Sequence, residues 1–224
     1  MRLVLFDCDG TLVDSAGVIH ETMARTFDAF DLAPPALDDT KSIIGLTLDI
    51  AIARLTGEPH VDDRALAMTA HYKAIYTDVR AEGFSERPFP GIAALMRTLG
   101  QREDLVIGAV TGKSRRGLDI IRTSHGFHFT VSRTADDCPS KPHPAMVTEC
   151  CAEAGFEPRD TLVIGDAIYD MQMAKGAGAT AIGAPKVTEH KMGTGTTSPL
   201  GITRCTLWIH AGTSTTWGKR CARL

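Results

Sequence analysis

Short apolar runs that each end in a polar motif are the feature that most constrains the fold of this chain. The first run, residues 3–6, leads directly into Asp7, and segments with helical periodicity separate the later runs. Such alternation is typical of a parallel sheet wrapped by helices. The further strands predicted in this way are residues 105–110, 130–131, 162–164 and 179–182. The predicted fold class is therefore α/β, with a Rossmann-like parallel sheet.

The long stretch between the first two predicted strands has the periodicity of helices. Apolar residues share one helical face in each of three groups: Ile19, Met23, Phe27 and Phe30; Leu48, Ala51, Ile52 and Leu55; Met68, Tyr72, Ile75 and Val79. Proline and glycine at 34–35, 57–59 and 88–91 separate these groups. An insertion of this size predicts a helical cap domain at 15–85, beside a core domain formed by 1–14 and 86–183.

Composition and charge exclude several classes of protein. The net charge of −3 indicates no nucleic-acid partner, and no apolar run is long enough to cross a bilayer. The six cysteines lack the CxxC spacing of metal sites, and the N-terminal apolar run is too short for a signal peptide. We therefore expect a cytoplasmic protein with no membrane partner, as a monomer or homodimer.

Residues 184–224 do not fit the pattern of the preceding chain. They contain nine Thr, five Gly and both Trp, with six Lys or Arg against the single acidic residue Glu189. A disordered, weakly basic extension is the simplest interpretation. A cationic binding arm is less consistent with basic residues that do not cluster, and a shift of reading frame near Gly183 would also produce so abrupt a change. We expect a disordered tail that takes no part in catalysis.

The first polar motif, residues 7–11, reads Asp-Cys-Asp-Gly-Thr and directly follows the first strand. Ligands of parallel α/β sheets bind beyond the carboxyl ends of the strands, so Asp7 and Asp9 should face the crevice there. Two residues apart on an extended backbone, their side chains would share a face and repel unless a cation intervenes. Mg²⁺, which binds carboxylates together with phosphate oxygens, suits such a place.

The second motif is Thr-Gly-Lys at 111–113, after the predicted strand 105–110. A hydroxyl at a strand end, followed by a helix with Ser114 as N-cap, suits the binding of a phosphoryl oxygen. In the third motif, Lys141 precedes Pro142, which fits the first turn of a helix and would place the lysine at the helix start. An ammonium there can neutralise a phosphate. Taken alone, the second motif is better interpreted as a plain helix start, and the third as a surface lysine beside a helix start.

The fourth motif, Gly-Asp-Ala-Ile-Tyr-Asp at 165–170, follows the predicted strand 162–164. Asp166 lies at the strand end, and Asp170 follows one helical turn later on the same side. This pair can complete a metal site with Asp7, although an N-cap aspartate and a solvated one would also fit the pattern.

The four motifs in this order resemble those of the haloacid dehalogenase superfamily, and of its phosphoglycolate phosphatase-like branch. The resemblance covers residues 1–183 and includes Gly-Leu-Thr at 45–47, which is similar to the cap loop of that branch. It implies that Asp7 attacks phosphorus to form an aspartyl-phosphate. It further implies that Asp9 protonates the leaving oxygen and then activates water, while Thr111 and Lys141 hold the phosphoryl group.

The same resemblance implies a magnesium site and a substrate class. Mg²⁺ would lie between the Asp7 carboxylate, the Asp9 carbonyl and Asp166, with Asp170 as a further ligand or neighbour. The partner would be a small phosphorylated metabolite, with 2-phosphoglycolate favoured. The cap, through the loop 45–47 and with Arg54 or Lys73 as candidates, would select the leaving group, although such cap residues are usually just solvated.

Two alternatives share the motifs. A sugar-phosphate mutase of the superfamily would use all four and would differ only in shielding its phosphoenzyme from water. A non-catalytic interaction protein with this fold would be expected to lack at least one motif residue, and none is missing. Dehalogenases of the superfamily resemble Asp-x-Tyr at the first motif, so Asp9 argues against that chemistry.

Overall fold

A six-stranded sheet in the order β5-β4-β1-β6-β7-β8 forms the centre of the core domain. The computed structural model describes residues 1–184 and 208–210. Its strands are β1 (Arg2–Phe6), β4 (Leu105–Val110), β5 (Val131–Arg133), β6 (Thr161–Gly165), β7 (Thr180–Gly183) and β8 (Trp208–His210). All neighbouring strands are parallel except β7 and β8. The predicted Rossmann-like α/β class is thus confirmed.

Pairing with the neighbouring strands decides where each strand ends, and the sequence pattern predicted these ends only approximately. The strand predicted at 130–131 begins and ends later, because β5 pairs Val131 with Gly108 and Arg133 with Val110. The antiparallel β8 was not predicted. Apart from Ala184 and β8, the tail that we expect to be disordered lies outside the described residues.

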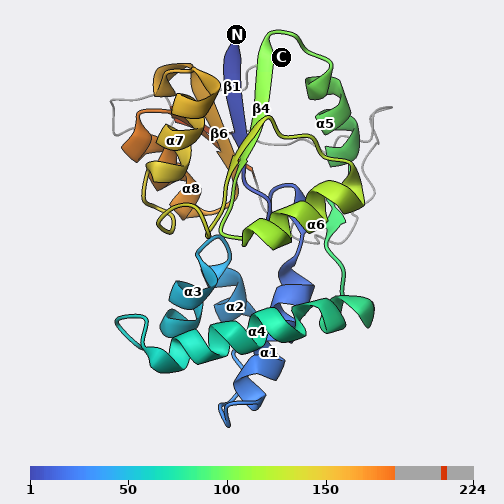
Figure 1. Ribbon diagram of the computed structural model, residues 1–224, viewed down its shortest axis with the longest axis vertical. Coiled ribbons are helices and arrows are strands. Elements are labelled where there is room, and N and C mark those ends of the chain that lie inside the picture. Colours follow the sequence, from blue (N-terminus) through green and yellow to red (C-terminus); the bar gives the residue numbers. More distant parts are fainter. Residues whose placement is uncertain (185–207, 211–224) are drawn as a thin grey trace, which may run out of the picture.

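Helices cover both faces of the sheet (Figure 1). α5 (Ile92–Gly100) and α6 (Arg115–His125) lie on one face, and α7 (Ala145–Ala154) and α8 (Ile168–Ala177) on the other. A 3₁₀ turn, Pro158–Asp160, precedes β6. Successive β1 side chains point to opposite faces. Leu3 and Leu5 accordingly belong to the apolar cluster under α7 and α8, and Val4 and Phe6 to the cluster under α5 and α6.

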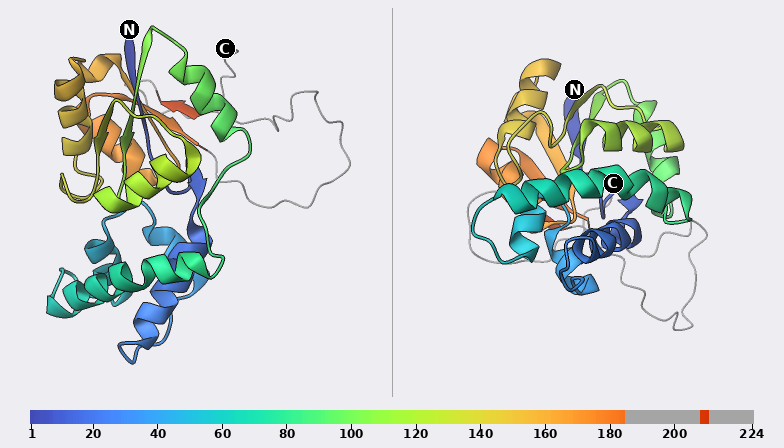
Figure 2. Two further views of the ribbon diagram at one scale, coloured as in Figure 1. Left: turned by 45° about the vertical axis from the view of Figure 1, so that its right-hand side comes forward. Right: turned by 60° about the horizontal axis from the view of Figure 1, so that its bottom comes forward.

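Four of the five helices between β1 and β4 form the cap, which lies beyond the carboxyl end of the sheet (Figures 1 and 2). They are α1 (Ala16–Asp28), α2 (Leu37–Ile43), α3 (Leu48–Leu55) and α4 (Asp63–Ala81). The three predicted apolar faces belong to α1, α3 and α4, whereas α2 was not predicted. The cap has an apolar cluster of its own, centred on Met23, Ile52 and Met68.

Two connections join the cap to the core. They pair as a short antiparallel ladder between β2 (Val13–Asp14) and β3 (Arg87–Pro88). Beyond this ladder, the Phe89 N–H donates to the Leu12 carbonyl at 3.1 Å. Domain limits at 14/15 and 85/86 remain our proposal. No helix in the described part of the chain combines the length and the apolar character needed to cross a membrane.

The tight spacing of the central strands generates a prediction for Gly108 in β4. A Cβ atom there would lie 2.7 Å from Leu5 Cδ2 and 2.7 Å from the Val131 carbonyl oxygen. We expect Gly108→Ala to lower the free energy of unfolding by about 1–3 kcal/mol, measured in urea, because the sheet must spread. Gly100→Ala is the control: it has open space around its Cβ, and added helix propensity should leave stability unchanged or raised. Equal stability of both variants would contradict this packing.

Candidate active site

Three neighbouring strands present the predicted residues at one edge of the sheet. β1 lies between β4 and β6, and the three strands are followed by Asp7, Thr111 and Asp166, respectively. The chain leaves β1 toward β4 on one side and later continues to β6 on the other, which opens a crevice at this edge. The Asp7 N–H donates to the Ile164 carbonyl at 2.8 Å, so the sheet pairing extends to the first motif residue.

Lys141 is buried at this edge, with its side chain fully shielded from solvent. Its Nζ lies 2.8 Å from Asp7 Oδ1 and 2.6 Å from Asp170 Oδ1. Burial by itself would lower the pKa of Lys141, but the carboxylates of Asp170 and Asp7 outweigh it and raise that pKa. The ammonium therefore stays charged between two carboxylates.

The predicted position of Lys141 at a helix start is wrong. α7 begins at Ala145 with Pro144 as N-cap, so Pro142 lies before the helix. Residues 140–143 instead form a separate turn, closed by the His143 N–H donating to the Ser140 carbonyl at 3.0 Å. This turn places the lysine at the sheet edge, where the two carboxylates hold its ammonium, rather than at the surface.

Asp7, Asp166 and Asp170 form an acidic cluster in which one oxygen of each carboxylate lies within 4.8 Å of the others. Asp170 Oδ2 accepts a hydrogen bond from the Ala167 N–H at 3.1 Å at the start of α8. Asp7 Oδ2 is buried and accepts no hydrogen bond from the described residues. Burial raises the pKa of Asp7 well above its ordinary value, with Asp170 and Asp9 adding to the effect and Lys141 opposing it, so a further cation beside Asp7 would favour the ionised carboxylate.

Asp7 and Asp170 flank the Lys141 ammonium, Asp166 lies beside them, and the buried Oδ2 of Asp7 accepts no hydrogen bond from the described residues. A hard cation with oxygen ligands would bind that oxygen, so the residues fit a divalent metal. Gly10 allows the loop to approach this cluster. Its φ is +79°, and a Cβ atom there would lie 2.5 Å from Asp166 Oδ2.

Asp9 points to a different partner. The cluster found among the described residues contains Asp7, Asp166 and Asp170, and not the Asp9 carboxylate. Asp9 Oδ1 instead lies 2.9 Å from Lys113 Nζ. Because β1 ends at Phe6, the extended geometry behind the expected shared face does not continue through Asp9. The side chains of Asp7 and Asp9 are therefore not arranged to share one cation.

Sequence reasoning missed the role of two residues near Asp9. Lys113 was noted only as the third residue of the Thr-Gly-Lys motif, and its side chain turns out to be 8% exposed and paired with Asp9. Glu86 carried no signal, because an acidic residue in a connection is usually solvated, yet it is buried and lies 2.6 Å from Lys113 Nζ. Lys113 could have been identified from its position in a motif. Glu86 could be identified only from the folded structure.

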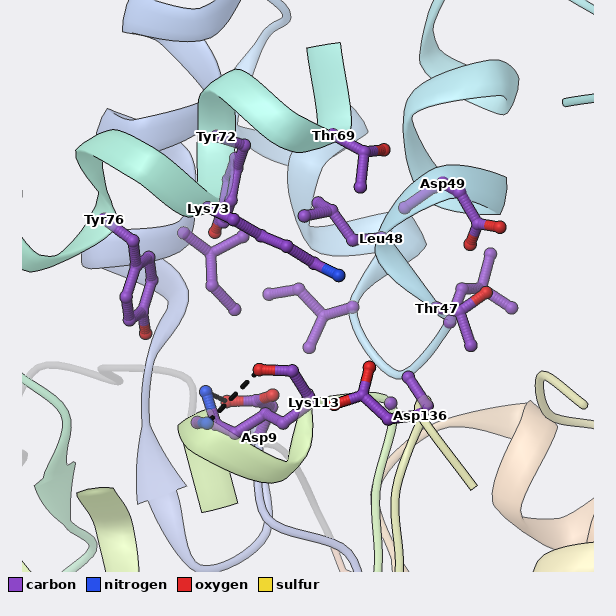
Figure 3. A pocket seen from close by; sticks show the side chains of 18 of the residues that line it. Asp9, Thr47, Leu48, Asp49, Thr69, Tyr72, Lys73, Tyr76, Lys113 and Asp136 are labelled. Atoms are coloured by element: carbon purple, nitrogen blue, oxygen red, sulfur yellow. Dashed lines mark hydrogen bonds and ion pairs between the residues drawn. The ribbon is translucent and has the colours of Figure 1, made fainter. Parts of the chain in front are cut away.

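A cavity of about 610 Å³ lies between cap and core (Figure 3). Asp9 and Lys113 line its core side, and Tyr76 and Lys73 of α4 line its cap side. Figure 3 shows the Lys73 side chain extending from α4 into this space. Much of the remaining wall is apolar, with Ile19, Met23, Ile43, Leu46 and Leu48 among the lining residues. The cavity thus offers room for a small ligand beside Asp9.

The cap loop 45–47 lies against the core motifs. The Thr47 N–H donates to Ser140 Oγ at 3.0 Å. A Cβ atom on Gly112 would lie 2.5 Å from the Leu46 carbonyl oxygen, so the loop approaches the second motif closely. Arg54, a candidate for selecting the leaving group, instead donates to the Tyr169 hydroxyl and is not among the residues lining the cavity.

The family model of haloacid dehalogenase-like hydrolases matches residues 4–184. The chain belongs to this family. The chain is also 30% identical over 191 residues to a phosphoglycolate phosphatase of Pseudomonas putida, an alignment that covers 81% of this chain and 68% of the relative. The phosphoglycolate phosphatase of Haemophilus influenzae is 27% identical, with 81% of this chain and 84% of the relative covered.

A solved structure agrees with this assignment. The crystal structure of a hydrolase from Pseudomonas syringae superimposes with a TM-score of 0.70 and 26% identity, covering 81% of this chain and 83% of that chain. The resemblance inferred from the motifs is confirmed: this haloacid dehalogenase-like enzyme is a hydrolase, and its relatives place it in the phosphoglycolate phosphatase-like branch.

The acidic cluster generates a prediction about metal binding. Mg²⁺ should raise the thermal unfolding midpoint of the metal-free enzyme, because a ligand that binds only the folded state stabilises it by about 2.7 kcal/mol at 100 times its dissociation constant. Asp166→Asn should remove most of this increase. Asp49→Asn, which removes a carboxylate that lines the cavity outside the cluster, should retain it. Equal stabilisation of all three proteins by Mg²⁺ would contradict a metal site at the cluster.

Proposed function

We propose that this enzyme is a Mg²⁺-dependent phosphatase that hydrolyses a small phosphate monoester through an aspartyl-phosphate on Asp7. The observation that carries the proposal is the buried Lys141 ammonium, 2.8 Å from Asp7 at an edge that also holds the acidic cluster. A nucleophilic carboxylate beside a fixed cation is what phosphoryl transfer needs, since its transition state depends mostly on positioning and on compensation of negative charge.

Asp7 is the proposed nucleophile. Its oxygen would form a bond to phosphorus while the bond from phosphorus to the leaving oxygen breaks. Lys141 would offset the charge of the attacking carboxylate and of the phosphoryl oxygens, and the buried Thr111 hydroxyl would bind one of those oxygens. When bound by the Asp7, Asp166 and Asp170 carboxylates and the Asp9 carbonyl, Mg²⁺ would supply positive charge to the phosphoryl group.

Asp9 is the proposed acid and base. It lines the cavity, where the leaving group would lie, rather than the acidic cluster. In the first step it would give a proton to the leaving oxygen. In the second step it would take a proton from the water that attacks the aspartyl-phosphate, which frees phosphate and restores Asp7.

The favoured substrate is 2-phosphoglycolate. Two named relatives are phosphoglycolate phosphatases, and the cavity presents a cation to the leaving group on its cap side. The Lys73 ammonium, which Figure 3 shows reaching into the cavity, could pair with the carboxylate of such a leaving group. We place the reaction in the cytoplasm, in keeping with the four buried free cysteines among the described residues.

This assignment of Lys73 can be tested by substitution. Lys73→Met should raise the KM for 2-phosphoglycolate by about tenfold, which is about 1.4 kcal/mol of lost binding. It should leave the KM for an uncharged alkyl phosphate nearly unchanged, because no carboxylate then needs the ammonium. Arg64→Met, an exposed position of the same helix outside the cavity lining, serves as the control in steady-state assays of phosphate release. An equal rise for both substrates would refute a carboxylate partner for Lys73.

The different roles of the two leading aspartates give the test of the mechanism. Asp7→Asn should reduce phosphate release to background without a trapped phosphoenzyme, because an amide is too weak a nucleophile. Asp9→Asn should lose about 10²–10⁴ in kcat on alkyl phosphates, and much less in the phosphorylation step with an aryl phosphate, whose leaving group needs no proton.

The measurement is acid-stable phosphoryl label on Asp7 together with phosphate release. Label should accumulate in Asp9→Asn, because water activation stays impaired. An active Asp7→Asn variant would overturn the mechanism, and equal losses of Asp9→Asn on both esters would refute only the role given to Asp9.

A further inference from the structure

Glu86 is a buried carboxylate that the proposed mechanism does not use. It lies in the connection from cap helix α4 to β3 and is 2% exposed. We propose that Glu86 is a positioning residue that holds Lys113 against Asp9 and makes this placement depend on how cap helix α4 sits on the core. The inference rests on the proposed function in one respect, the role of Asp9 as the acid and base.

On the core side, a single ammonium joins Glu86 to Asp9. Lys113 Nζ lies 2.6 Å from Glu86 Oε1 and 2.9 Å from Asp9 Oδ1. The Lys113 side chain is 8% exposed and that of Glu86 is 1% exposed, so water competes little for these contacts. Lys113 is also tied at its backbone, where its N–H donates to Thr111 Oγ1 at 3.2 Å. Glu86 therefore fixes the position of Lys113, and Lys113 in turn orients the Asp9 carboxylate.

On the cap side, α4 supplies one hydrogen-bond donor and one cation to the same carboxylate. The Tyr76 hydroxyl donates to Glu86 Oε1 at 2.5 Å, and Arg80 Nε lies 3.0 Å from Glu86 Oε2. Tyr76 and Arg80 are four residues apart and therefore share one face of the helix. His125 of α6 makes a further contact, with its ring Nε2 2.8 Å from the Glu86 carbonyl oxygen. Glu86 thus joins α4 of the cap to both Lys113 and α6 of the core.

The charges of this group explain why Glu86 must be ionised. Burial by itself would raise the pKa of Glu86, but Lys113, Tyr76 and Arg80 outweigh it and lower that pKa. Two carboxylates, Glu86 and Asp9, face two cations, Lys113 and Arg80, so the buried group is balanced. Loss of the Glu86 charge would leave Lys113 with Asp9 and with the face of the Tyr76 ring, 5.9 Å from its Nζ, and would remove the ionic link between α4 and that lysine.

A positioning role differs from a merely structural one in its effect on the leaving group. If Glu86 acts through Asp9, its loss should lower kcat strongly for esters whose leaving oxygen needs a proton. It should lower kcat less for esters whose leaving oxygen does not. Movement of α4 away from the core would loosen Tyr76 and Arg80, then Glu86, and finally the hold of Lys113 on Asp9. Asp9 would thus be held in position only when α4 of the cap is packed against the core.

The test is Glu86→Gln, which keeps the shape of the side chain and removes its charge. We expect kcat to fall by about tenfold or more on an alkyl phosphate, and by much less on an aryl phosphate, with KM little changed. Tyr76→Phe, which removes one donor to Glu86, should show a smaller difference of the same sign and keeps the test open if Glu86→Gln folds poorly. Glu82→Gln is the matched control: Glu82 lies in the same connection but pairs at the surface with Arg25.

A double variant separates the outcomes. Because Glu86 and Asp9 would act as one unit, Glu86→Gln with Asp9→Asn should be no slower than Asp9→Asn alone. Equal losses of Glu86→Gln on both esters, or a loss that multiplies with that of Asp9→Asn, would overturn the positioning role while leaving the proposed function intact. An Asp9→Asn variant without any leaving-group dependence would instead refute the acid–base role of Asp9, and the inference with it.

Discussion

The ion pairs of Lys141 are the interaction on which the active edge depends. A fully buried ammonium lies between Asp7, which follows β1, and Asp170, which lies in the first turn of α8, so one charge joins two elements far apart in the sequence. Removing one partner of a buried ion pair leaves an uncompensated charge and commonly costs about 3–5 kcal/mol. In the proposed mechanism, the same cation would offset the charge of the phosphoryl group. One side chain would then serve both the stability of this sheet edge and its chemistry.

The cap contacts the core at or beside the sequence motifs of the candidate active site. Each of four cap or connection residues contacts a core residue that belongs to a motif or lies next to one. These pairs are Leu46 with Gly112, Thr47 with Ser140, Arg54 with Tyr169, and Glu86 with Lys113. The core residues that contact the cap lie in the same short loops as the motif residues. A shift of the cap would therefore displace residues within one or two positions of the proposed reacting groups.

Much of the fold could be predicted because its signals are local. Apolar runs that end in Asp7, Thr111 and Asp166 place these residues at strand ends, and carboxyl ends of parallel strands meet at one edge. Helical periodicity likewise predicted three of the four cap helices, whereas α2 is short and was missed. The end of β5 and the pairing of β8 escaped prediction because a ladder partner, not the strand itself, decides where pairing stops.

By itself, the sequence determined the α/β class, the cap insertion and the order of the four motifs, since periodicity and strand-end position belong to neighbouring residues. Only the tertiary structure decided which lysine serves which aspartate, with Lys141 beside Asp7 and Lys113 beside Asp9. It also buried Glu86, which in the sequence is one more acidic residue in a connection between two segments. The reason is physical: the partner of a charge, and the water withheld from it, are set by chain segments that meet only on folding.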